Sequence, residues 1–353
     1  MTTCRFPAEW ERHDATWMAW PHHEPDWPGK FEPIRWVYAE IVRALHTFER
    51  VEILCHDDIV LAEAEQCLTA HGVNLGRCRL HLCPNDRVWL RDSAPTGVLR
   101  DGQFSWCNWG FNAWAKYDNY AADAAVGTFV AHASERPRRE PPRPDGKGRV
   151  ILEGGGFETD GEGTLLVTEE WLLSGVQDRN PGLGRAEYER LFRDELGITR
   201  TVWLGEGCVG DDTHGHVDDI ARFTAPGVVL LAVESDPTDE NHGRSMDNVE
   251  RLARATDAAG RRVRVVPLPY PRAVMMDGQR LPASYANFYI ANGVVIVPTF
   301  NDPADRLALD IIARELPRHV VVGIHAVDLV WGLGTVHCLT QQQPSLGAAA
   351  GAN

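Results

Sequence analysis

A ten-residue stretch, "GDDTHGHVDD" at 210–219, gathers two histidines and four aspartates. It precedes the apolar run "IARFTAPGVVLL", and together they predict a strand that enters a hairpin. Alternate residues of a strand share a face, so Asp212, His214, His216 and Asp218 would point the same way. Two histidines and a carboxylate could bind zinc. The spare carboxylates suit a positively charged organic group equally well.

Two further stretches combine polar and aromatic residues. "NDRVWLRDSAP" (85–95) carries Trp89 and Asp92 just before an expected turn. "ILEGGGFETDGEGT" (151–164) predicts a strand that ends in Glu153, followed by three glycines that allow the backbone to come close to a ligand. Neither a Gly-Lys-Ser/Thr triplet nor a G-x-G-x-x-G pattern before a helix is present, so nucleotide binding is rejected. A plain β-turn at the glycines stays open.

The fourth stretch is "WGLGTVHCLTQQQP" (331–344), where Cys338 follows a glycine-rich bend. A cysteine at a tight turn in polar surroundings is a candidate nucleophile, because its thiolate is accessible and its pKa can be tuned. Taken alone, the pattern also fits a buried structural cysteine.

These four stretches must be positioned by elements that alternate between helix and strand. Leading glycines open three similar apolar runs at Gly163, Gly227 and Gly293, and Gly97 opens a fainter one. The intervals of 66, 64 and 66 residues indicate about five repeated α/β units, with "ATWMAWP" (15–21) closing the ring from the N-terminus. Chance spacing of strands in an α/β chain is the alternative. The predicted helices cover 32–51, 185–197 and 305–316, and the predicted strands cover 163–170, 227–235 and 293–302.

Composition favours a soluble globular protein of 353 residues, with 44% hydrophobic and 24% charged residues. No apolar run approaches the ~20 residues that a membrane span needs. The polar N-terminus does not resemble a signal peptide, so we expect a cytoplasmic protein. The net charge of −15 repels phosphate backbones and favours cationic ligands, so neither nucleic acid nor membrane is expected as a partner.

The domain organisation that we expect is one catalytic domain over residues 1–345. The segment 134–148, "SERPRREPPRPDGKG", is rich in proline and arginine and is predicted to form an exposed, mobile loop. Residues 346–353 are predicted to be a flexible C-terminal tail. A homodimer is considered as its oligomeric state.

The four stretches resemble the agmatine deiminase family, within the guanidine-modifying pentein superfamily and related to bacterial-type peptidyl-arginine deiminases. The resemblance runs nearly from end to end and implies a five-bladed α/β propeller with pseudo-fivefold repeats of about 65 residues, in agreement with the glycine spacing. Its motifs are "FPAEWERHDATWMAWPH" (6–22), "WLRD" (89–92), "WGFNAW" (109–114), "EGGGFETDGEGTLLVTEE" (153–170), "GDDTHGHVDD" (210–219) and "HCLTQQQP" (337–344).

The chain departs from the family pattern at three places. Ala94 replaces a glycine of the usual "RDxGPT", and "FNAWAKYDNY" (111–120) differs from the commoner "FNAWGG". The early "PHHEPDWPGK" (21–30) lacks the typical asparagine between Asp26 and Trp27. In the family these positions lie near the substrate-facing rim, so the departures bear on specificity more than on chemistry.

The resemblance also implies roles for individual residues. Asp92 and Asp218 would clamp a guanidinium, and Cys338 would attack its central carbon. His216 would protonate the departing ammonia and then activate water. Glu153 would contact the substrate or orient His216. The substrate-binding residues would be Trp89, Asp212 and Trp114, with Trp89 stacking against the substrate.

No metal and no cofactor is expected, because a zinc ion would compete for Cys338 and His216 and repel a cationic substrate. The rival chemistry is hydrolysis by water on a zinc ion held by Asp212, His214 and His216. A second rival is a guanidine- or polyamine-binding protein without catalysis.

The expected substrate is a small cationic guanidine. Near the motifs, spare basic residues are limited to Arg87, Arg91 and Arg222, and the remaining set is acidic and aromatic. Such surroundings suit agmatine, which is positive at both ends, and disfavour the carboxylate of free arginine. The predicted reaction is therefore hydrolysis of agmatine to N-carbamoylputrescine and ammonia through a Cys S-linked amidino intermediate. Peptidyl-arginine is the alternative substrate.

Overall fold

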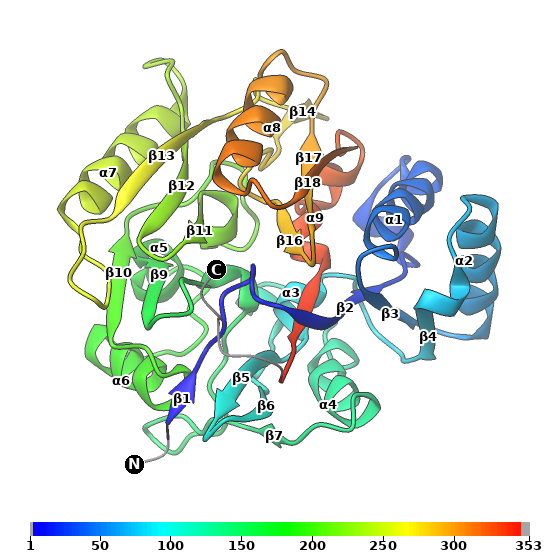
Figure 1. The fold of residues 1–353 in the computed structure, drawn as a ribbon, viewed down its shortest axis with the longest axis horizontal. Helices are drawn as coiled ribbons and strands as arrows, with labels where there is room; N and C mark the ends of the chain where they lie inside the picture. Colours follow the sequence, from blue (N-terminus) through cyan, green and yellow to red (C-terminus); the bar gives the residue numbers. More distant parts are fainter. Residues whose placement is uncertain (1–2, 347–353) are drawn as a thin grey trace.

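The computed structural model describes residues 3–346 and shows a mixed α/β fold built mainly from five sheets (Figure 1). Each sheet repeats one pattern: its first strand is antiparallel to the second, and the second is parallel to the third. Helices make the crossover that the parallel pair requires. In Figure 1 the five sheets surround a central region that contains α3 (Leu90–Ser93) and α9 (Val336–Leu339).

The strands follow this pattern around the molecule. The sheets contain β5 (Thr96–Arg100), β6 (Gln103–Cys107) and β7 (Arg138–Arg139), with β1 (Cys4–Arg5) at the edge; β8 (Glu158–Thr159), β9 (Thr164–Thr168) and β10 (Arg200–Leu204); β11 (Ala221–Ala225), β12 (Val228–Val233) and β13 (Arg264–Pro269); β16 (Tyr289–Ala291), β17 (Val294–Thr299) and β18 (Val320–His325); and β19 (Gln341–Pro344), β2 (His13–Ala19), β3 (Arg50–Cys55) and β4 (Cys78–Leu82). A separate hairpin joins β14 (Met275–Met276) to β15 (Gln279–Arg280).

The longer helices pack outside the sheets in Figure 1. They are α1 (Phe31–Leu45), α2 (Asp58–Ala70), α4 (Asp123–Ala133), α6 (Arg185–Leu196), α7 (Glu240–Arg254) and α8 (Ala304–Glu315). The short helix α5 (Glu169–Leu173) follows β9. The predicted helices at 185–197 and 305–316 are confirmed by α6 and α8. The helix predicted over 32–51 ends earlier, at Leu45, because the chain turns there to enter β3.

Turn glycines account for the repeat that the sequence suggested. Gly163, Gly227 and Gly293 each precede a middle strand, with φ of 100, 71 and 78°. Such positive φ values are what a tight hairpin turn requires and what glycine adopts freely. Gly97 does not belong to this series, because it lies inside β5; the matching turn residue is Gly102, with φ of 74°. The corrected intervals are 61, 64 and 66 residues.

The two ends of the chain meet in one sheet. β19 pairs antiparallel with β2, so "ATWMAWP" (15–21) joins the C-terminal strand as the sequence suggested. This pairing brings Gln343 to Trp17, whose indole nitrogen donates a hydrogen bond of 3.0 Å to the Gln343 side chain. It also fixes the position of α9, which immediately precedes β19.

The proline- and arginine-rich segment 134–148 is largely exposed. It contributes β7, which pairs with β6 as an edge strand, so part of it belongs to a sheet. The predicted tail falls mostly on residues 347–353, which lie outside the described residues. Within the described part of the chain, no helix is both long and apolar enough to cross a membrane.

Candidate active site

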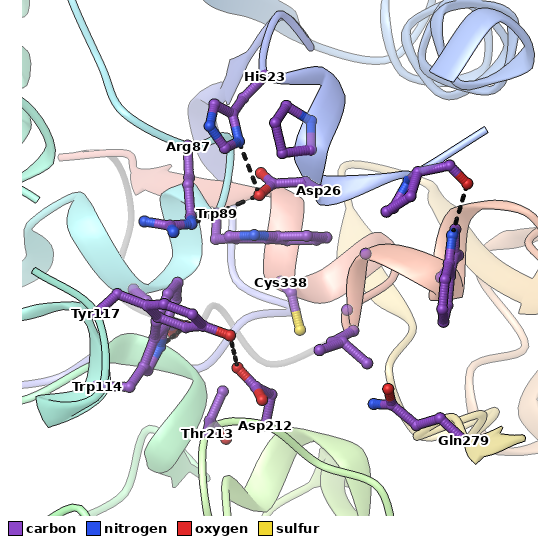
Figure 2. A pocket seen from close by; sticks show the side chains of 17 residues that line it. His23, Asp26, Arg87, Trp89, Trp114, Tyr117, Asp212, Thr213, Gln279 and Cys338 are labelled. Atoms are coloured by element: carbon purple, nitrogen blue, oxygen red, sulfur yellow. Dashed lines mark hydrogen bonds and ion pairs between the residues drawn. The ribbon is translucent and has the colours of Figure 1, made fainter. Parts of the chain in front are cut away.

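A cavity of about 370 Å³ lies at the centre of the molecule, and the Cys338 sulfur points into it beneath the Trp89 ring (Figure 2). The walls come from segments far apart in the sequence. The lining residues are His23, Pro25, Asp26, Pro28, Arg87, Trp89, Asp92, Trp114, Tyr117, Asp212, Thr213, Gln279, Trp331, Gly332, Leu333, Gly334 and Cys338.

Cys338 is held by an asparagine that the sequence analysis did not single out. The Asn287 amide nitrogen lies 3.1 Å from the sulfur, and its amide oxygen accepts hydrogen bonds from the Thr335 hydroxyl and from the His337 and Cys338 backbone. Asn287 thus positions both the short helix α9 and its thiol. Only the fold brings these residues together, since 51 positions separate them.

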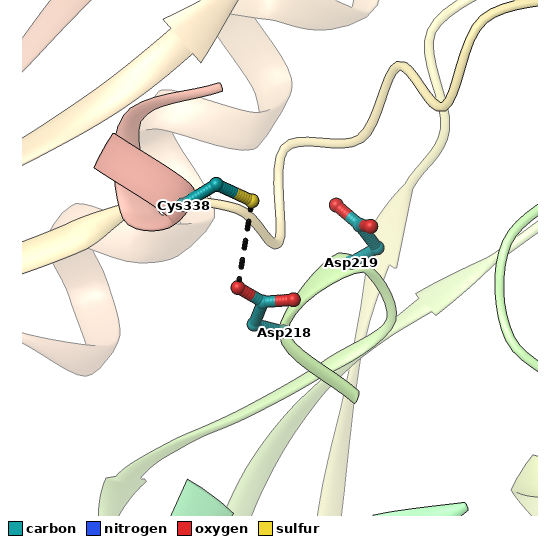
Figure 3. Close-up of side chains that lie close together, drawn as sticks. All are labelled: Asp218, Asp219 and Cys338. Atoms are coloured by element: carbon teal, nitrogen blue, oxygen red, sulfur yellow. Dashed lines mark hydrogen bonds between the residues drawn. The ribbon is translucent and has the colours of Figure 1, made fainter. Parts of the chain in front are cut away.

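Carboxylates surround the thiol. Asp218 and Asp219 face the sulfur (Figure 3), and one ligand atom from each of the three side chains lies within 4.8 Å of the other two. Such a set could hold a metal ion, and it could equally receive a planar cation. Burial, together with Asp218, Asp219 and Asp92, raises the pKa of Cys338 well above its usual value. The thiol therefore keeps its proton in the free protein at neutral pH.

His216 lies between two acids on the same side of the cavity. Its Nε2 is 3.4 Å from Glu153 and its Nδ1 is 3.7 Å from Asp92. Burial alone would lower its pKa, but Asp92 and Glu153 outweigh burial and raise the pKa of His216 to about 9. The imidazole is therefore protonated at neutral pH and can act as a general acid.

Glu153 is fully buried and does not line the cavity. Trp171 donates to it at 2.8 Å and Arg179 at 3.1 Å. Although burial would raise its pKa, Arg179 and His216 lower the pKa of Glu153 to about 2. The contact with His216 supports the first role considered for Glu153, orienting that imidazole; the second role, contact with the substrate, stays a prediction.

Asp92 lies on α3, where it lines the cavity and accepts two hydrogen bonds. The Trp114 indole donates at 2.9 Å and the Gly155 backbone at 3.1 Å. Burial, opposed by His216 and reinforced by Asp218, raises the pKa of Asp92 to about 6. The fixed indole and backbone donors set the carboxylate's orientation toward His216.

Each of the three glycines after Glu153 stands where a side chain would collide. A Cβ on Gly154 would lie 2.4 Å from the Arg91 backbone oxygen, and one on Gly156 would lie 2.5 Å from the Trp171 ring. A Cβ on Gly155 would lie 2.7 Å from His216 Nδ1 and 3.0 Å from both Asp92 and Asp218. The glycines thus allow the backbone to pack directly against the reactive side chains. The sequence had suggested only that they allow the backbone to come close to a ligand.

A buried charged network supports Asp218 from behind. His337 Nδ1 lies 2.7 Å from Asp218 and its Nε2 lies 2.9 Å from Glu9. His337 thus bridges the carboxylates of Asp218 and Glu9 through its two ring nitrogens. Burial would raise the pKa of Asp218, but His337 and His216 lower it. The remaining buried ion pairs join Arg91 to Glu9 at 3.1 Å, Arg222 to Glu9 at 2.7 Å, and Arg222 to Glu158 at 3.2 Å.

The strand predicted at 210–219 is wrong. This segment is a loop that ends in the short 3-10 helix η5 (Val217–Asp219), and β11 begins only at Ala221. Asp211 holds the loop by accepting hydrogen bonds from the backbone of Thr213, Gly215 and His216. Gly210 and Gly215 take φ of 93 and 98°, which no regular strand contains.

Because the segment is a loop, its side chains do not share one face. His214 turns away and lies 2.9 Å from the Ser174 hydroxyl, whereas His216 faces Glu153 and Asp92. Asp212 lies on the cavity wall. The zinc set Asp212, His214 and His216 is therefore not assembled in the structure.

The outer acids of the cavity are paired with cations. Asp212 forms an ion pair with Lys116 and accepts a hydrogen bond from Tyr117 at 2.7 Å. Asp26 lies 2.9 Å from His23 and 3.6 Å from Arg87. In the inner site one oxygen of Asp218 and the Nδ1 of His216 are buried without a hydrogen-bond partner, as is the second oxygen of Asp26 at the outer wall. Unpaired buried polar atoms beside a thiol are suited to a polar ligand.

All eight site residues predicted from the sequence lie at or beside the cavity. Cys338, Asp92, Trp89, Trp114 and Asp212 line the cavity, while His216, Asp218 and Glu153 lie directly behind it. Trp89 packs against Trp27, with ring centroids 5.7 Å apart. The sequence analysis missed the supporting groups Asn287, Asp219, His337, Glu9 and Arg179, although Glu9, Asp219 and His337 stood inside quoted motifs.

Comparison with known proteins gives consistent matches over nearly the whole chain. The family model of the Porphyromonas-type peptidyl-arginine deiminases matches residues 5–344. The chain is 36% identical to the agmatine deiminase of Pseudomonas aeruginosa strain LESB58, over 97% of this chain and 95% of that protein. Its structure resembles the agmatine deiminase of Enterococcus faecalis, with a TM-score of 0.89, 29% identity and coverage of 98% and 96%. A substrate-bound agmatine deiminase of C. jejuni shares the fold, with a TM-score of 0.86, 24% identity and coverage of 98% and 97%.

Proposed function

Since the chain belongs to the Porphyromonas-type peptidyl-arginine deiminase family, we propose that it hydrolyses agmatine to N-carbamoylputrescine and ammonia. It is thus a hydrolase acting on the C–N bond of a linear amidine. The observation that carries the proposal is a buried thiol set among the carboxylates of Asp92, Asp218 and Asp219 at a cavity wall. A guanidinium is the planar cation that this arrangement fits, because each carboxylate can accept two of its N–H groups.

Substrate binding prepares the nucleophile. In the free protein the surrounding carboxylates hold the proton on the Cys338 thiol. A guanidinium bound between Asp92 and Asp218 brings a positive charge beside the sulfur, so the pKa of the thiol falls and its proton leaves to solvent. The resulting thiolate is formed only when the electrophilic carbon is in place.

The reaction proceeds in two balanced steps. The Cys338 thiolate attacks the guanidinium carbon, and protonated His216 gives its proton to the departing amino group, which leaves as ammonia. Neutral His216 then takes a proton from water as the hydroxide adds to the S-linked amidino carbon. Collapse of this adduct expels the thiolate, and the product O–H proton is released to solvent, where the ammonia takes it up.

Neighbouring groups support these steps. Glu153 keeps His216 oriented and protonated, and the fully buried Arg179 balances the charge of Glu153. Trp89 offers its ring face to the substrate, and Trp114 fixes Asp92 through its indole hydrogen bond. All the groups in this scheme belong to the chain itself.

Agmatine is favoured over arginine because, over residues 3–346, the cavity lining contains no cation that is free to receive a carboxylate. Arg91 and Arg222 are buried in the network with Glu9 and do not line the cavity. Arg87 does line it, but its guanidinium donates to Asn119 and stacks on Tyr117 at 4.5 Å. We assign Asp212 to the distal ammonium of agmatine.

The architecture that accompanies this function is a five-bladed propeller formed by residues 1–345 as one catalytic domain. Five sheets of one strand pattern, with the chain ends paired in the last sheet, support it. A cytoplasmic location and a homodimer remain predictions from the sequence.

Ammonia release from agmatine, free arginine and a blocked arginine amide at equal concentrations tests the proposal. Agmatine is expected to react at least about a hundredfold faster than free arginine. Burying the carboxylate of arginine without a partner costs a few kcal/mol, which corresponds to a ratio of this size. If free arginine reacts fastest, the charge argument is wrong. If the amide reacts fastest, the substrate is peptidyl-arginine. If none of the three releases ammonia, the chain is a binding protein and the assignment as an enzyme fails.

A further inference from the structure

The cavity wall contains a left-handed turn made without glycine. Ala113, Trp114 and Ala115 take φ of 49, 59 and 54°, a region that L-residues rarely adopt in succession. The Asn112 side chain accepts from the Ala115 backbone at 3.0 Å. Gln177 donates both to the Trp114 carbonyl and to the Asp212 carbonyl at 3.1 Å, which ties the turn to the 210–219 loop. The turn is therefore held in a shape that places the next residue beside Asp212.

That next residue is Lys116, which forms an ion pair with Asp212. The other oxygen of the same carboxylate accepts the Tyr117 hydroxyl at 2.7 Å. Asp212 lines the cavity, whereas Lys116 does not, and its side chain is 40% exposed. A cation thus approaches the cavity's outer carboxylate from the solvent side.

The choice of lysine at this position is informative. Only three of the chain's 35 basic residues are lysines, at positions 30, 116 and 147. Arginine would bind a carboxylate through two parallel hydrogen bonds, whereas lysine acts as a point charge at the end of a flexible side chain. The pair with Asp212 can therefore open at little cost. A lysine side chain is also an ammonium on four methylenes, chemically the same as the aminobutyl half of agmatine.

We infer that Lys116 is a specificity-determining residue that occupies Asp212 until the distal ammonium of the substrate replaces it. This inference rests on the proposed function, because it names the competitor for one end of agmatine. Lys116 neutralises the outer carboxylate in the free protein, so it weakens the preference for a cationic tail. Removing its charge should sharpen that preference without altering the chemistry at Cys338.

The test compares agmatine with n-butylguanidine, which has the same chain length and lacks the amine. The variants are Lys116→Met, which keeps the apolar stem, Asp212→Asn, and the double variant. Lys147→Met is the matched control, because its side chain is 80% exposed and its charge lies in the 134–148 segment. Ammonia release gives kcat and KM for each compound.

In Lys116→Met the KM for agmatine should fall about two- to fivefold, the range expected for loss of a partly exposed ion pair. Its kcat, and both constants for n-butylguanidine, should stay at wild-type values. In the Asp212→Asn background the same substitution should leave the ratio of the two substrates unchanged. Lys147→Met should match the wild type throughout.

Two results would overturn the inference. An equal change for both guanidines would mean that Lys116 acts through the shape of the turn. An unchanged or higher KM for agmatine would mean that it does not compete for Asp212. Wild-type turnover of agmatine is read separately in the same assay; its absence would refute the proposed function and this inference with it.

Discussion

Replacing Gly155 by alanine tests the geometry of the active centre without removing any reactive group. The glycine does not adopt a positive φ, so alanine can take the same backbone conformation. Its Cβ would lie 2.7 Å from His216 Nδ1 and 3.0 Å from Asp92 and Asp218, where ordinary contacts are 3.4–4 Å. The three side chains must therefore retreat by about 0.5–1 Å to reach normal contact.

A shift of that size in reacting groups is expected to lower kcat/KM about a hundredfold, equivalent to about 2.7 kcal/mol of transition-state stabilisation. The assay is ammonia release from agmatine, with the far-ultraviolet circular dichroism spectrum and Tm measured on the same preparation. Gly175→Ala is the matched control, because a Cβ there meets nothing within 4 Å. It should retain wild-type activity.

The reasoning fails if Gly155→Ala is as active as the control while folded, since the catalytic side chains could not then lie where the structure places them. Unfolding of Gly155→Ala would be a different result, traced by the circular dichroism spectrum. In that case Gly155→Ala and Gly175→Ala would be compared at a lower temperature, at which both are folded.

Further predictions concern the same residues. Cys338→Ser should retain its fold and lose turnover, because a hydroxyl is a much weaker nucleophile than a thiolate, whereas Cys78→Ser should react normally; measurable turnover by the first variant would remove Cys338 from its role. Asp92→Asn and Asp218→Asn should each lose about a hundredfold or more in kcat/KM, from the 2–5 kcal/mol cost of breaking a desolvated charge pair; normal turnover by both would place the cation elsewhere. The kcat/KM should rise with pH between about 6 and 9. The pKa of Asp92 is about 6, that of His216 is about 9, and that of Cys338 is raised well above its usual value. In the free enzyme the Cys338 thiol must therefore lose its proton before it attacks, while His216 keeps its own. The rising limb of kcat should lie at lower pH, because bound guanidinium lowers the thiol pKa; coincident limbs would contradict this.

The repeated sheets could be predicted because their signals are local. Apolar runs after Gly163, Gly227 and Gly293 predicted three middle strands, and the structure has β9, β12 and β17 there. The first interval of the repeat was measured from the wrong glycine, Gly97, because a glycine that starts an apolar run can lie in a strand as well as in a turn. Only the φ angle distinguishes the two cases, and the sequence does not contain it.

The 210–219 loop shows why local patterning failed at the site. Alternating polar and small residues are typical of a strand. Here, however, Asp211 accepts hydrogen bonds from the backbone of its own loop, and His214 points away toward Ser174. The chemistry was still predictable, because the reactive residue types stood inside long motifs. The residues that support them were not predictable, because they are distant in the sequence. Asn287 contacts Cys338 from 51 positions away, and Glu9 contacts His337 from 328 positions away.

The central claim is that Cys338 forms a covalent bond to the guanidine carbon of agmatine. A single-turnover reaction stopped by acid at successive times, followed by mass spectrometry of the intact protein and its peptides, tests it most directly. The account predicts a transient mass increase equal to agmatine minus ammonia, on the peptide that carries Cys338, and none in Cys338→Ser. Product formed with no mass change on that peptide at any time, or formed by Cys338→Ser, would contradict it.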